Sequence, residues 1–342
     1  MAKKVVIAHD DFAVTKTLCE EYFGFLEEYG YETVYVSDYK GLTLKDSEDL
    51  MMLTEKNKPE DLQLNQDLLR EVADAEILIV HFSIVNKELL DAAKCLKVLG
   101  VCRGGMNNVN VTYAKERGIQ VYNSASRSSN AVADFTVALA IAEVRNLVRA
   151  SMDMRNGRVT KNFLNYDSSH DMRNMTVGVI GYGLIGRRVI ERFKAFGAKI
   201  IVYDPYLSEQ VISDGGETPV SLETLLTTAD IITIHLRHSE TTHHFLNRER
   251  LEMIKPTAFL VNTARAGLID EEALYELLDA HKIMGAALDV FTDEPLRLDS
   301  PFYKLDNLTM TPHIAGMSCD TITNSVELMQ QAILDYIKKD TE

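Results

Sequence analysis

Three residues whose types suit chemistry on a small carboxylic acid lie in the second half of the chain. Arg265, Glu294 and His313 each come shortly after an apolar segment. An arginine matches a carboxylate with two parallel hydrogen bonds, and a histidine exchanges protons near neutral pH. A neighbouring carboxylate would orient the histidine ring and favour its protonated form. This set predicts a site where a 2-keto acid is held and its carbonyl oxygen is protonated as a hydride arrives.

A glycine-rich turn between two apolar segments predicts the source of that hydride. The motif Gly181-Tyr182-Gly183-Leu184-Ile185-Gly186 follows the apolar run that begins at Thr176. In a dinucleotide-binding turn the first glycine permits the sharp bend and the second lets the backbone approach the pyrophosphate. The third glycine lets the following helix pack on the strand. The N–H groups that open this helix face the phosphates, so Leu184 and Ile185 belong to the same predicted contact.

An acidic residue at the end of the next apolar run indicates which dinucleotide is bound. Asp204 lies 18 residues after Gly186, where its carboxylate can accept hydrogen bonds from the ribose hydroxyls. No Arg or Lys occurs between Tyr203 and Glu217 to neutralise a 2′-phosphate. The sequence therefore predicts NAD as the cofactor and disfavours NADP.

The elements that must position these residues show the pattern of parallel α/β sheets, in which short apolar runs alternate with amphipathic stretches. The strands expected in a first unit are Val5–Ala8, Ile77–Val80, Leu96–Val101 and Ile119–Tyr122. The strands expected in a second unit lie near Val177, Ile200, Ile231, Phe259, Ala286 and Leu308. Helices are expected over Asn130–Arg149 and Thr321–Lys339, a helix or two within the acidic region 45–74, and a connecting loop over 155–173.

These elements predict an α/β protein of two Rossmann-like domains, each built on a doubly wound parallel sheet. We expect the chain to cross between them near Asn123 and again near Ala315. Residues 124–315 would form the NAD-binding domain, and residues 1–123 with 316–342 the substrate-binding domain. The expected active site is a cleft between the domains, because its closure would exclude water from the hydride path.

Composition narrows the class of partner. The chain has 342 residues and a formal net charge of −15, which disfavours nucleic acid and anionic membranes as partners. Its four cysteines show no C-x-x-C spacing, so reduced thiols and a cytoplasmic location are expected. No apolar run approaches the length of a membrane span, and the run behind Lys3 and Lys4 is too short for a signal peptide.

Several segments in a fixed order make the chain resemble the D-isomer-specific 2-hydroxyacid dehydrogenase family, of which phosphoglycerate dehydrogenase is a well-known type. The resemblance runs from about Ile77 to Ser318. Besides the motifs above, it is carried by the segments Leu96–Gly105, Ala114–Ile119 and Asn130–Asp134. It implies hydride transfer between NAD and a small D-2-hydroxy acid, which could be phosphorylated or derived from a sugar acid.

The resemblance also implies roles for individual residues. Arg265 would clamp the substrate carboxylate, His313 would act as acid and base, and Glu294 would be its partner. Asp289 would contact the nicotinamide carboxamide. Other contacts expected are Phe82, Ser83, Arg103 and Gly104 with the substrate, the first two through backbone amides, and His235 and Thr263 with the cofactor. In this family the segment Asn130–Arg149 packs against its symmetry mate, so a homodimer is expected.

The chain departs from the family pattern at several positions. The usual G-x-D-N-x-D appears with Asn107 and Asn110 in place of both acids. Ala266 stands where a glycine usually follows the arginine, and Arg237 where a proline usually follows His-Leu. Phosphoglycerate dehydrogenases often carry Arg-Ser where this chain has His81-Phe82-Ser83. These differences disfavour phosphoglycerate itself as the substrate.

The site residues also have ordinary structural explanations. In that case His313 would be a core histidine, and Arg265 would form a surface ion pair. Asp289 would cap a helix, and Arg103 would form a structural salt bridge. Four histidines lie close in sequence but lack cysteine or acid partners at ligand spacing, so no metal is expected; these are His235, His238, His243 and His244.

Two functions from different classes fit these observations. The first is a hydride-transferring dehydrogenase. The second is a nucleotide-sensing binding protein, like the corepressors that share this fold. A methyltransferase would not explain Arg265, Glu294 and His313 together. Consumption of NADH with a panel of 2-keto acids would separate the first two.

Overall fold

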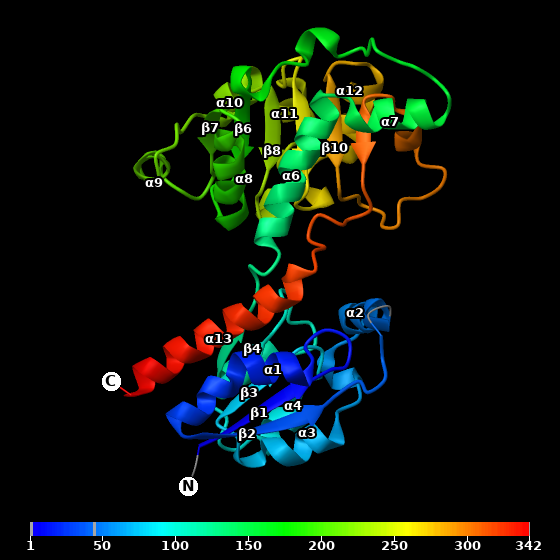
Figure 1. The fold of residues 1–342 in the computed structure, drawn as a ribbon. Helices are drawn as coiled ribbons and strands as arrows, with labels where there is room; N and C mark the ends of the chain where they lie inside the picture. The colour runs from blue at the N-terminus through cyan, green and yellow to red at the C-terminus, as the bar shows by residue number, and fades with distance from the viewer. Residues whose placement is uncertain (1–2, 44–45, 342) are drawn as a thin grey trace. The chain divides into compact units, whose positions relative to one another are not determined.

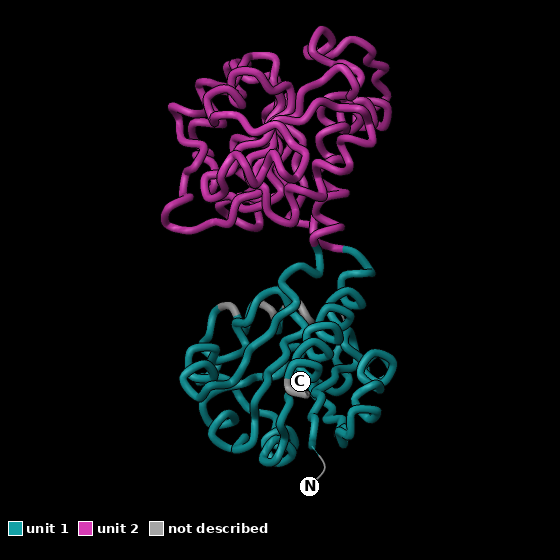
Figure 2. The backbone as a smooth tube through the Cα atoms, turned by 90° about the vertical axis from the view of Figure 1, so that its left-hand side faces the viewer, with its two compact units in different colours: residues 1–128, 318–342 teal, residues 129–317 magenta. Residues whose placement is uncertain are grey.

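The chain forms two compact units, and the computed structural model describes its residues 3–43 and 46–341. Unit 1 comprises residues 1–128 and 318–342, and unit 2 comprises residues 129–317 (Figure 2). The chain therefore leaves unit 1 once and returns to it. The boundaries expected from the sequence, at 123 and 315, lie a few residues before these division points.

Unit 1 is built on a five-stranded parallel sheet in the order β2-β1-β3-β4-β5. The strands are β1 Lys3–His9, β2 Tyr31–Ser37, β3 Ile77–Val80, β4 Val98–Val101 and β5 Gln120–Asn123. The four strands expected from the sequence are present. β2 was not expected, because it is an edge strand and most of its side chains are only partly buried, so it lacks a continuous apolar run.

Helices cover this sheet, and one of them comes from the C-terminus. The helices of unit 1 are α1 Lys16–Phe23, α2 Asp46–Lys56, α3 Gln66–Glu71, α4 Lys87–Ala92, α5 Val111–Glu116 and α13 Asp320–Thr341, with 3-10 turns at Gly24–Tyr29, Pro59–Asp61 and Val72–Asp74. Figure 1 shows α13, in red, beside α1. The apolar spacing that predicts α13 buries Val326, Met329 and Ile333, and the helix packs against α1, β4 and β5. The acidic region 45–74 contains α2 and α3, and its first residue, Lys45, lies outside the described residues.

Unit 2 contains a six-stranded parallel sheet in the order β11-β10-β9-β8-β6-β7. The strands are β6 Thr176–Ile180, β7 Lys199–Tyr203, β8 Ile231–Ile234, β9 Phe259–Asn262, β10 Gly285–Leu288 and β11 Leu308–Met310. All six expected strands are confirmed. Beyond β7, Val202 also pairs with Pro219, so a single bridge extends the sheet by one further position. The strand order reverses at β6, and in such sheets ligands bind beyond the carboxyl ends of the strands at this point.

The helices of unit 2 confirm one expectation and correct another. They are α6 Ser129–Val144, α7 Leu147–Arg155, α8 Leu184–Ala195, α9 Glu209–Asp214, α10 Leu222–Thr228, α11 Arg248–Glu252 and α12 Glu271–Asp279. Short 3-10 turns lie at Tyr166–Ser168, Met172–Asn174, Glu240–Thr242, Ala266–Leu268 and Pro301–Lys304. Residues 155–173 hold only two of these turns after α7 ends, as expected for a connecting segment. The single helix expected over 130–149 is wrong, because Asn146 adopts φ 56° and separates α6 from α7.

The apolar surface expected along 130–149 is also largely covered by unit 2 itself. Val132, Val137 and Leu139 are buried, and α6 packs against α8 and the sheet. Only after the break, at Leu147, is a large apolar side chain mostly exposed. No helix in the described ranges is long and apolar enough to cross a membrane.

Candidate active site

The glycine turn after β6 has the geometry that a dinucleotide requires. Gly181 has φ 104°, and a Cβ built on it would lie 2.8 Å from the carbonyl oxygen of His235. A Cβ on Gly186 would collide with the carbonyl oxygen of Gly181. At Gly183, by contrast, no heavy atom lies within 4 Å of the Cβ position. The turn is therefore closed on the protein side and open where a pyrophosphate must approach.

Asp204 is held against this turn by backbone amides. Its Oδ2 accepts a hydrogen bond from the N–H of Tyr182 at 2.7 Å. Its Oδ1 accepts from Tyr206 at 2.8 Å and from Leu207 at 3.1 Å. The carboxylate is thus fixed at the end of β7, beside the N-terminus of α8, which begins with Leu184 and Ile185. This placement suits an acceptor for ribose hydroxyls.

His235 and Thr263 follow β8 and β9, at the same edge of the sheet. The Nδ1 of His235 is buried and has no hydrogen-bond partner among the described residues. Its Nε2 lies 2.9 Å from the hydroxyl of Thr233. Burial lowers the pKa of His235 to about 3, so the ring is neutral at physiological pH. Thr263 is buried, and its hydroxyl lies 2.6 Å from that of Thr136 in α6.

Glu294 and His313 form a pair in unit 2. The Nδ1 of His313 lies 2.7 Å from Oε2 of Glu294, and the two side chains are 44% and 37% exposed. Oε1 of Glu294 accepts a hydrogen bond from the N–H of Phe291 at 3.0 Å, which fixes the carboxylate. A pocket of about 500 Å³, with Phe291 and Met310 in its wall, adjoins the pair. Such a pair leaves Nε2 of the imidazole to exchange a proton with a ligand.

Asp289 supports the turn that carries His313. This carboxylate is fully buried at the end of β10. It accepts hydrogen bonds from the hydroxyl of Thr311 at 2.6 Å, the N–H of Ile314 at 3.0 Å and the N–H of Ala315 at 2.8 Å. His313, between these partners, has φ 56°. The geometry gives Asp289 a bracing role, and its contact with nicotinamide stays a prediction.

Arg265 follows β9, and its backbone is fixed by Asn262. The side-chain amide of Asn262 accepts from the N–H of Ala264 at 3.0 Å and donates to the carbonyl of Arg265 at 2.9 Å. The guanidinium is exposed, and Nη1 donates to the carbonyl of Ala264 at 2.6 Å. The backbone is therefore rigid while most of the guanidinium faces solvent, as a clamp for a carboxylate requires.

In unit 1, the segment after β3 presents three N–H groups. Asn108 donates to the carbonyls of His81 at 3.2 Å and Ser83 at 2.8 Å, and Tyr39 donates to the carbonyl of Phe82 at 3.4 Å. The backbone N–H groups of Phe82, Ser83 and Ile84 have no hydrogen-bond acceptor among the described residues. All three residues are buried, and buried N–H groups nearly always have an acceptor. The segment is thus suited to an anionic ligand.

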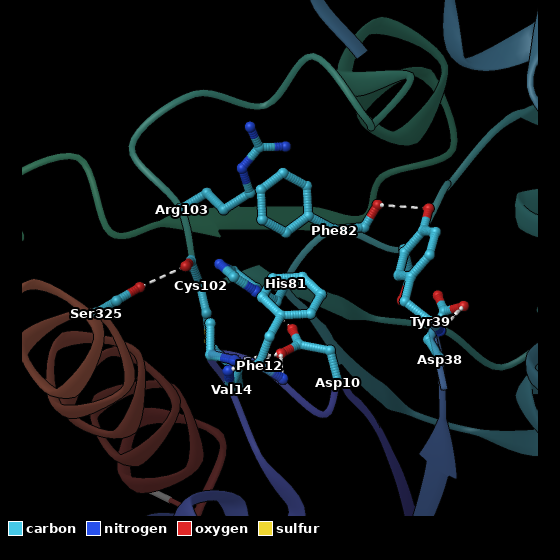
Figure 3. Close-up of polar contacts among 12 residues, drawn as sticks. Asp10, Phe12, Val14, Asp38, Tyr39, His81, Phe82, Cys102, Arg103 and Ser325 are labelled. Carbon is cyan, nitrogen blue, oxygen red and sulfur yellow. Dashed lines mark hydrogen bonds and ion pairs between the residues drawn. The ribbon is translucent and has the colours of Figure 1, made fainter. Parts of the chain in front are cut away.

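The side chains around this segment form a buried polar cluster (Figure 3). His81 and Asp10 form a hydrogen-bonded pair, with Nδ1 2.7 Å from Oδ2. The guanidinium of Arg103 lies 4.0 Å from the centre of the Phe82 ring, and Nη1 donates to Asn108 at 3.4 Å. Arg103 is only 5% exposed. Gly104, the other expected substrate contact, is partly exposed, and its carbonyl accepts from Asn123 at 2.6 Å.

The departures from the family pattern have mostly structural explanations. The side chain of Asn110 accepts a hydrogen bond from Tyr113 at 3.0 Å and caps the N-terminus of α5, a role in which Asn and Asp are equivalent. Asn107 is exposed. Ala266 begins a 3-10 turn with ordinary backbone geometry, and Arg237 is exposed. None of these changes removes a group from the sites described above.

Sequence reasoning missed the residues that support the site. Asn108 and Asn262 fix the backbones of 81–83 and 262–265, Tyr39 binds the carbonyl of Phe82, and Asp10 pairs with His81. The signal that could have found Asp10 and Asn262 is a polar residue at the end of an apolar strand. Tyr39 and Asn108 carry no such signal.

Three of the four histidines considered as metal ligands contact one another; they are His238, His243 and His244. His238 Nε2 lies 3.3 Å from His243 Nδ1, and the rings of His243 and His244 are stacked at 4.0 Å. In residues 3–43 and 46–341, no group of three or more His, Cys, Asp or Glu side chains is placed to hold a metal ion.

Residues 137–315 match the family described as D-isomer specific 2-hydroxyacid dehydrogenase, NAD binding domain. The chain is 40% identical over 250 residues to a D-3-phosphoglycerate dehydrogenase of Methanocaldococcus jannaschii, a match that covers 72% of this chain and 47% of the relative. It is 35% identical over 280 residues to a hydroxypyruvate reductase of Thermotoga maritima, covering 81% of this chain and 90% of the relative. The chain thus spans about half the length of the first relative and most of the second.

A solved structure with the same fold is a D-isomer specific 2-hydroxyacid dehydrogenase from Lactobacillus delbrueckii ssp. bulgaricus in its NAD complexed form. It matches 98% of this chain and 98% of its own with a TM-score of 0.74, at 22% sequence identity. This similarity establishes the fold, which consists of two Rossmann-like parallel sheets, each with flanking helices.

Proposed function

Since the chain belongs to the D-isomer-specific 2-hydroxyacid dehydrogenase family, with an NAD-binding domain over residues 137–315, we propose that it transfers a hydride between NAD and a small D-2-hydroxy acid. The observation that carries this proposal is the Glu294–His313 pair, with 2.7 Å between Oε2 and Nδ1. The pair belongs to the same unit as the glycine turn after β6. A binding protein that only senses the nucleotide would need neither a histidine–carboxylate pair nor an arginine clamp.

Each residue has one step in the proposed reaction. Reduced NAD, when bound, supplies the hydride. Arg265 holds the carboxylate of the 2-keto acid and polarises its carbonyl. His313 donates the proton from Nε2 to the carbonyl oxygen, and Glu294 stabilises the imidazolium before this transfer. In the oxidation direction, neutral His313 removes the hydroxyl proton.

Unit 1 contributes hydrogen-bond donors in this proposal. The N–H groups of residues 82–84 bind the carboxylate of the acid, and Arg103 with Gly104 borders the substrate. The support is that these N–H groups have no described acceptor although the residues are buried. Chemically, a carboxylate satisfies several N–H donors at once because it has two acceptor oxygens.

The cofactor contacts follow from the geometry of unit 2. We propose that Gly183 and the first turn of α8 bind the pyrophosphate, and that Asp204 binds the ribose. His235, Thr263 and Asp289 would then line the nicotinamide end. The open space at Gly183 and the unpartnered Nδ1 of His235 support these assignments.

A short 2-keto acid is the proposed substrate class. The relative matched along most of its length is named hydroxypyruvate reductase. This chain has His81-Phe82-Ser83 where phosphoglycerate dehydrogenases often carry Arg-Ser, and His81 is buried against Asp10. A phosphorylated acid would need another cation for its second charged group, either Arg103 or Arg237.

A panel of 2-keto acids tests the function directly. NADH consumption would be followed with glyoxylate, hydroxypyruvate, pyruvate, phosphohydroxypyruvate and a sugar-derived 2-keto acid. We expect turnover with at least one of the short acids and formation of the D-hydroxy acid. Tight NADH binding with no turnover on any acid would favour the nucleotide-sensing alternative instead.

A homodimer is the proposed assembly, through the surface of α7 and the segment that follows it. Large apolar side chains are exposed there; they are Leu147, Met152, Met154, Val159, Leu164 and Tyr166. The same elements line a pocket of about 550 Å³. A surface rich in exposed apolar side chains commonly marks a protein interface, and a second copy of the chain would cover them.

Light scattering tests this assembly. The wild type should have twice the 38.5 kDa mass of one chain, and Met152→Lys should give the single mass. Leu298→Lys is the matched control, because Leu298 is an exposed leucine of unit 2 outside this surface. A monomeric wild type at micromolar concentration would overturn the proposal.

A cytoplasmic location is also proposed. Its support is that all four cysteines are free, two buried and two exposed, which suits a reducing compartment. Cell fractionation of the native host would test it.

A further inference from the structure

The buried Asp10–His81 pair has no step in the chemistry proposed above. From its geometry we propose that it is a positioning pair, which sets the backbone of residues 82–84 so that their N–H groups can receive the substrate carboxylate. The identity of the ligand rests on the proposed function, whereas the positioning of the segment does not.

The pair joins the two strands between which a ligand is expected in this kind of sheet. Asp10 directly follows β1, and His81 directly follows β3. In the strand order β2-β1-β3-β4-β5, the chain first adds β2 on one side of β1 and then adds β3 on its other side. Ligands of open parallel sheets bind beyond the strand ends at such a point. The two side chains are 2% and 3% exposed, so the pair is an internal link and not a surface ion pair.

Asp10 is a rigid anchor. Its Oδ1 accepts hydrogen bonds from the N–H groups of Phe12 at 3.2 Å, Ala13 at 2.6 Å and Val14 at 3.1 Å. Burial alone would raise the pKa of Asp10, but the hydrogen bonds from His81 and these amides hold it below its usual value. The carboxylate is therefore ionised, and its second oxygen, Oδ2, is directed at His81.

His81 is neutral and donates from Nδ1. Burial lowers the pKa of His81, and the partly offsetting contact with Asp10 does not restore it. A neutral imidazole opposite an ionised carboxylate must carry its proton on the nitrogen that faces the carboxylate. The hydrogen bond thus fixes both the tautomer and the orientation of the ring.

The orientation of His81 is transmitted to the next residues by close contacts. The rings of His81 and Phe82 meet edge-on with their centroids 4.5 Å apart, and the ring centroids of Phe12 and Phe82 are 5.9 Å apart (Figure 3). Tyr39 and Asn108 hold the carbonyls of residues 81–83. The carbonyls are thus held by protein donors and the side chain of His81 by Asp10, while the N–H groups of residues 82–84 have no described acceptor.

A second acid–base group is the competing explanation for such a pair. The geometric similarity to Glu294–His313 is close, since each pair has 2.7 Å between Nδ1 and a carboxylate oxygen. The two histidines differ in access, because the His313 side chain is 44% exposed and that of His81 is 3% exposed. A histidine that cannot reach solvent or ligand is poorly suited to proton exchange, so positioning is the better explanation.

Two substitutions at His81 separate these explanations. His81→Asn keeps a side-chain N–H donor near the Nδ1 position, whereas His81→Leu keeps the apolar volume and removes the donor. The Asp10→Asn/His81→Leu double variant removes the buried charge that His81→Leu would leave unpaired. Each variant is measured for its thermal midpoint, the Kd of NADH, and the KM and kcat of the best 2-keto acid.

We expect His81→Leu to raise KM for the acid by about tenfold to a hundredfold, the size of one lost hydrogen bond to a charged group. The kcat at saturating acid and the Kd of NADH should stay within about threefold of wild type, as expected for lost ground-state binding. His81→Asn should have a KM close to that of the wild type, and the double variant should have a KM as high as that of His81→Leu. A His81→Asn variant as poor as His81→Leu, or a collapse of kcat in both, would overturn the proposal.

Hydrogen exchange supplies a readout that does not depend on activity. Without any ligand, a peptide covering residues 77–90 should exchange faster in His81→Leu and in the double variant than in wild type or His81→Asn. If the wild type reduces no 2-keto acid, the proposed function fails while this result still decides the positioning. Equal exchange in all four proteins would refute the positioning even if the enzyme is active.

Discussion

Individual residues of the candidate site hold conformations that ordinary side chains avoid. His313 has φ 56°, a left-handed backbone that costs a residue with a Cβ about 1–2 kcal/mol. Asp289 offsets this cost, because its buried carboxylate binds the N–H groups of Ile314 and Ala315 immediately after the turn. Strain of this kind is retained where a fixed side-chain direction matters. The turn therefore serves to aim the imidazole, with Glu294 fixing its rotation.

Substitution of His313 tests the proton transfer. His313→Ala should lower kcat by about 10²–10⁴, the usual contribution of a positioned acid–base group, while NADH binding is retained. His281 is a matched control, since it too is a histidine of unit 2 with positive φ, 48°, and a carboxylate 4.0 Å away. His281→Ala should leave kcat unchanged. Near-native turnover in His313→Ala would require a different acid.

Substitution of Asp204 tests the choice of cofactor. Its carboxylate is held beside the glycine turn and would repel a 2′-phosphate. Asp204→Ala should weaken NADH binding and narrow the preference for NADH over NADPH. Asp214→Ala, a change at an exposed acid of α9, should do neither. Fluorescence titrations with both dinucleotides measure the ratio, and a wild type that prefers NADPH would show the assignment of Asp204 to be wrong.

Secondary-structure elements position the site through polar residues at their ends. Asn262 at the end of β9 holds the backbone of Arg265, and Asn108 holds the segment after β3. Asn146 ends the α6–α7 continuity with φ 56° and hydrogen-bonds Asn165 at 2.6 Å. Asparagine suits all these positions because its short amide can bind backbone groups and tolerate unusual dihedral angles. Asn107 and Asn110, which replace the two acids of the family motif, differ in this respect, because only Asn110 caps a helix.

The cap on α5 gives a test at this scale. Asn110→Ala should lower the free energy of unfolding by about 1 kcal/mol, because one N–H at the helix start loses its acceptor. Asn107→Ala is the control, as Asn107 is exposed in the same loop. Urea denaturation of both variants measures the difference. Equal effects of the two substitutions would contradict the capping role.

At the scale of the whole molecule, the proposed function requires a strongly acidic chain to bind anions. Its net charge of −15 opposes the approach of both NAD and a carboxylic acid. The proposed sites overcome this with local donors, namely the N-terminus of α8, the N–H groups of residues 82–84 and the guanidinium of Arg265. Short-range donors of this kind act within a few ångströms, where the diffuse surface charge is screened by salt.

A stability measurement over pH tests the environment of His235 in the folded protein. Its pKa is about 3 when folded and 6.5 in an unfolded reference, so below the higher value only the unfolded chain takes up the proton. Stability should therefore fall as pH decreases from 6.5 toward 3. His235→Gln removes this part of the dependence. Urea unfolding at about pH 7.5 and about pH 5 should show a smaller difference in the variant than in wild type.

The sequence by itself determined the features that depend on local pattern. The glycine turn, the ten expected strands and the helix near the C-terminus were all identifiable, because apolar periodicity and glycine spacing act over a few neighbouring residues. The sequence also placed Glu294 beside His313, and their side chains are hydrogen-bonded, while their catalytic roles stay predictions. β2 and the break at Asn146 were not identifiable, since an edge strand is only half buried and a single asparagine within an apolar stretch does not by itself mark the end of a helix.

Only the tertiary structure decided which polar side chains support which backbone. Asp10 and His81 are 71 residues apart, and Asn108 lies 25 residues from the carbonyl of Ser83 that it binds. Nothing in the local pattern marks such partners, because their contact depends on the order in which parallel strands are assembled. The burial of α6 within unit 2 is likewise a consequence of packing on α8 and the sheet. An amphipathic or apolar stretch of sequence shows how much apolar surface must be buried. Only the folded chain determines which elements bury it.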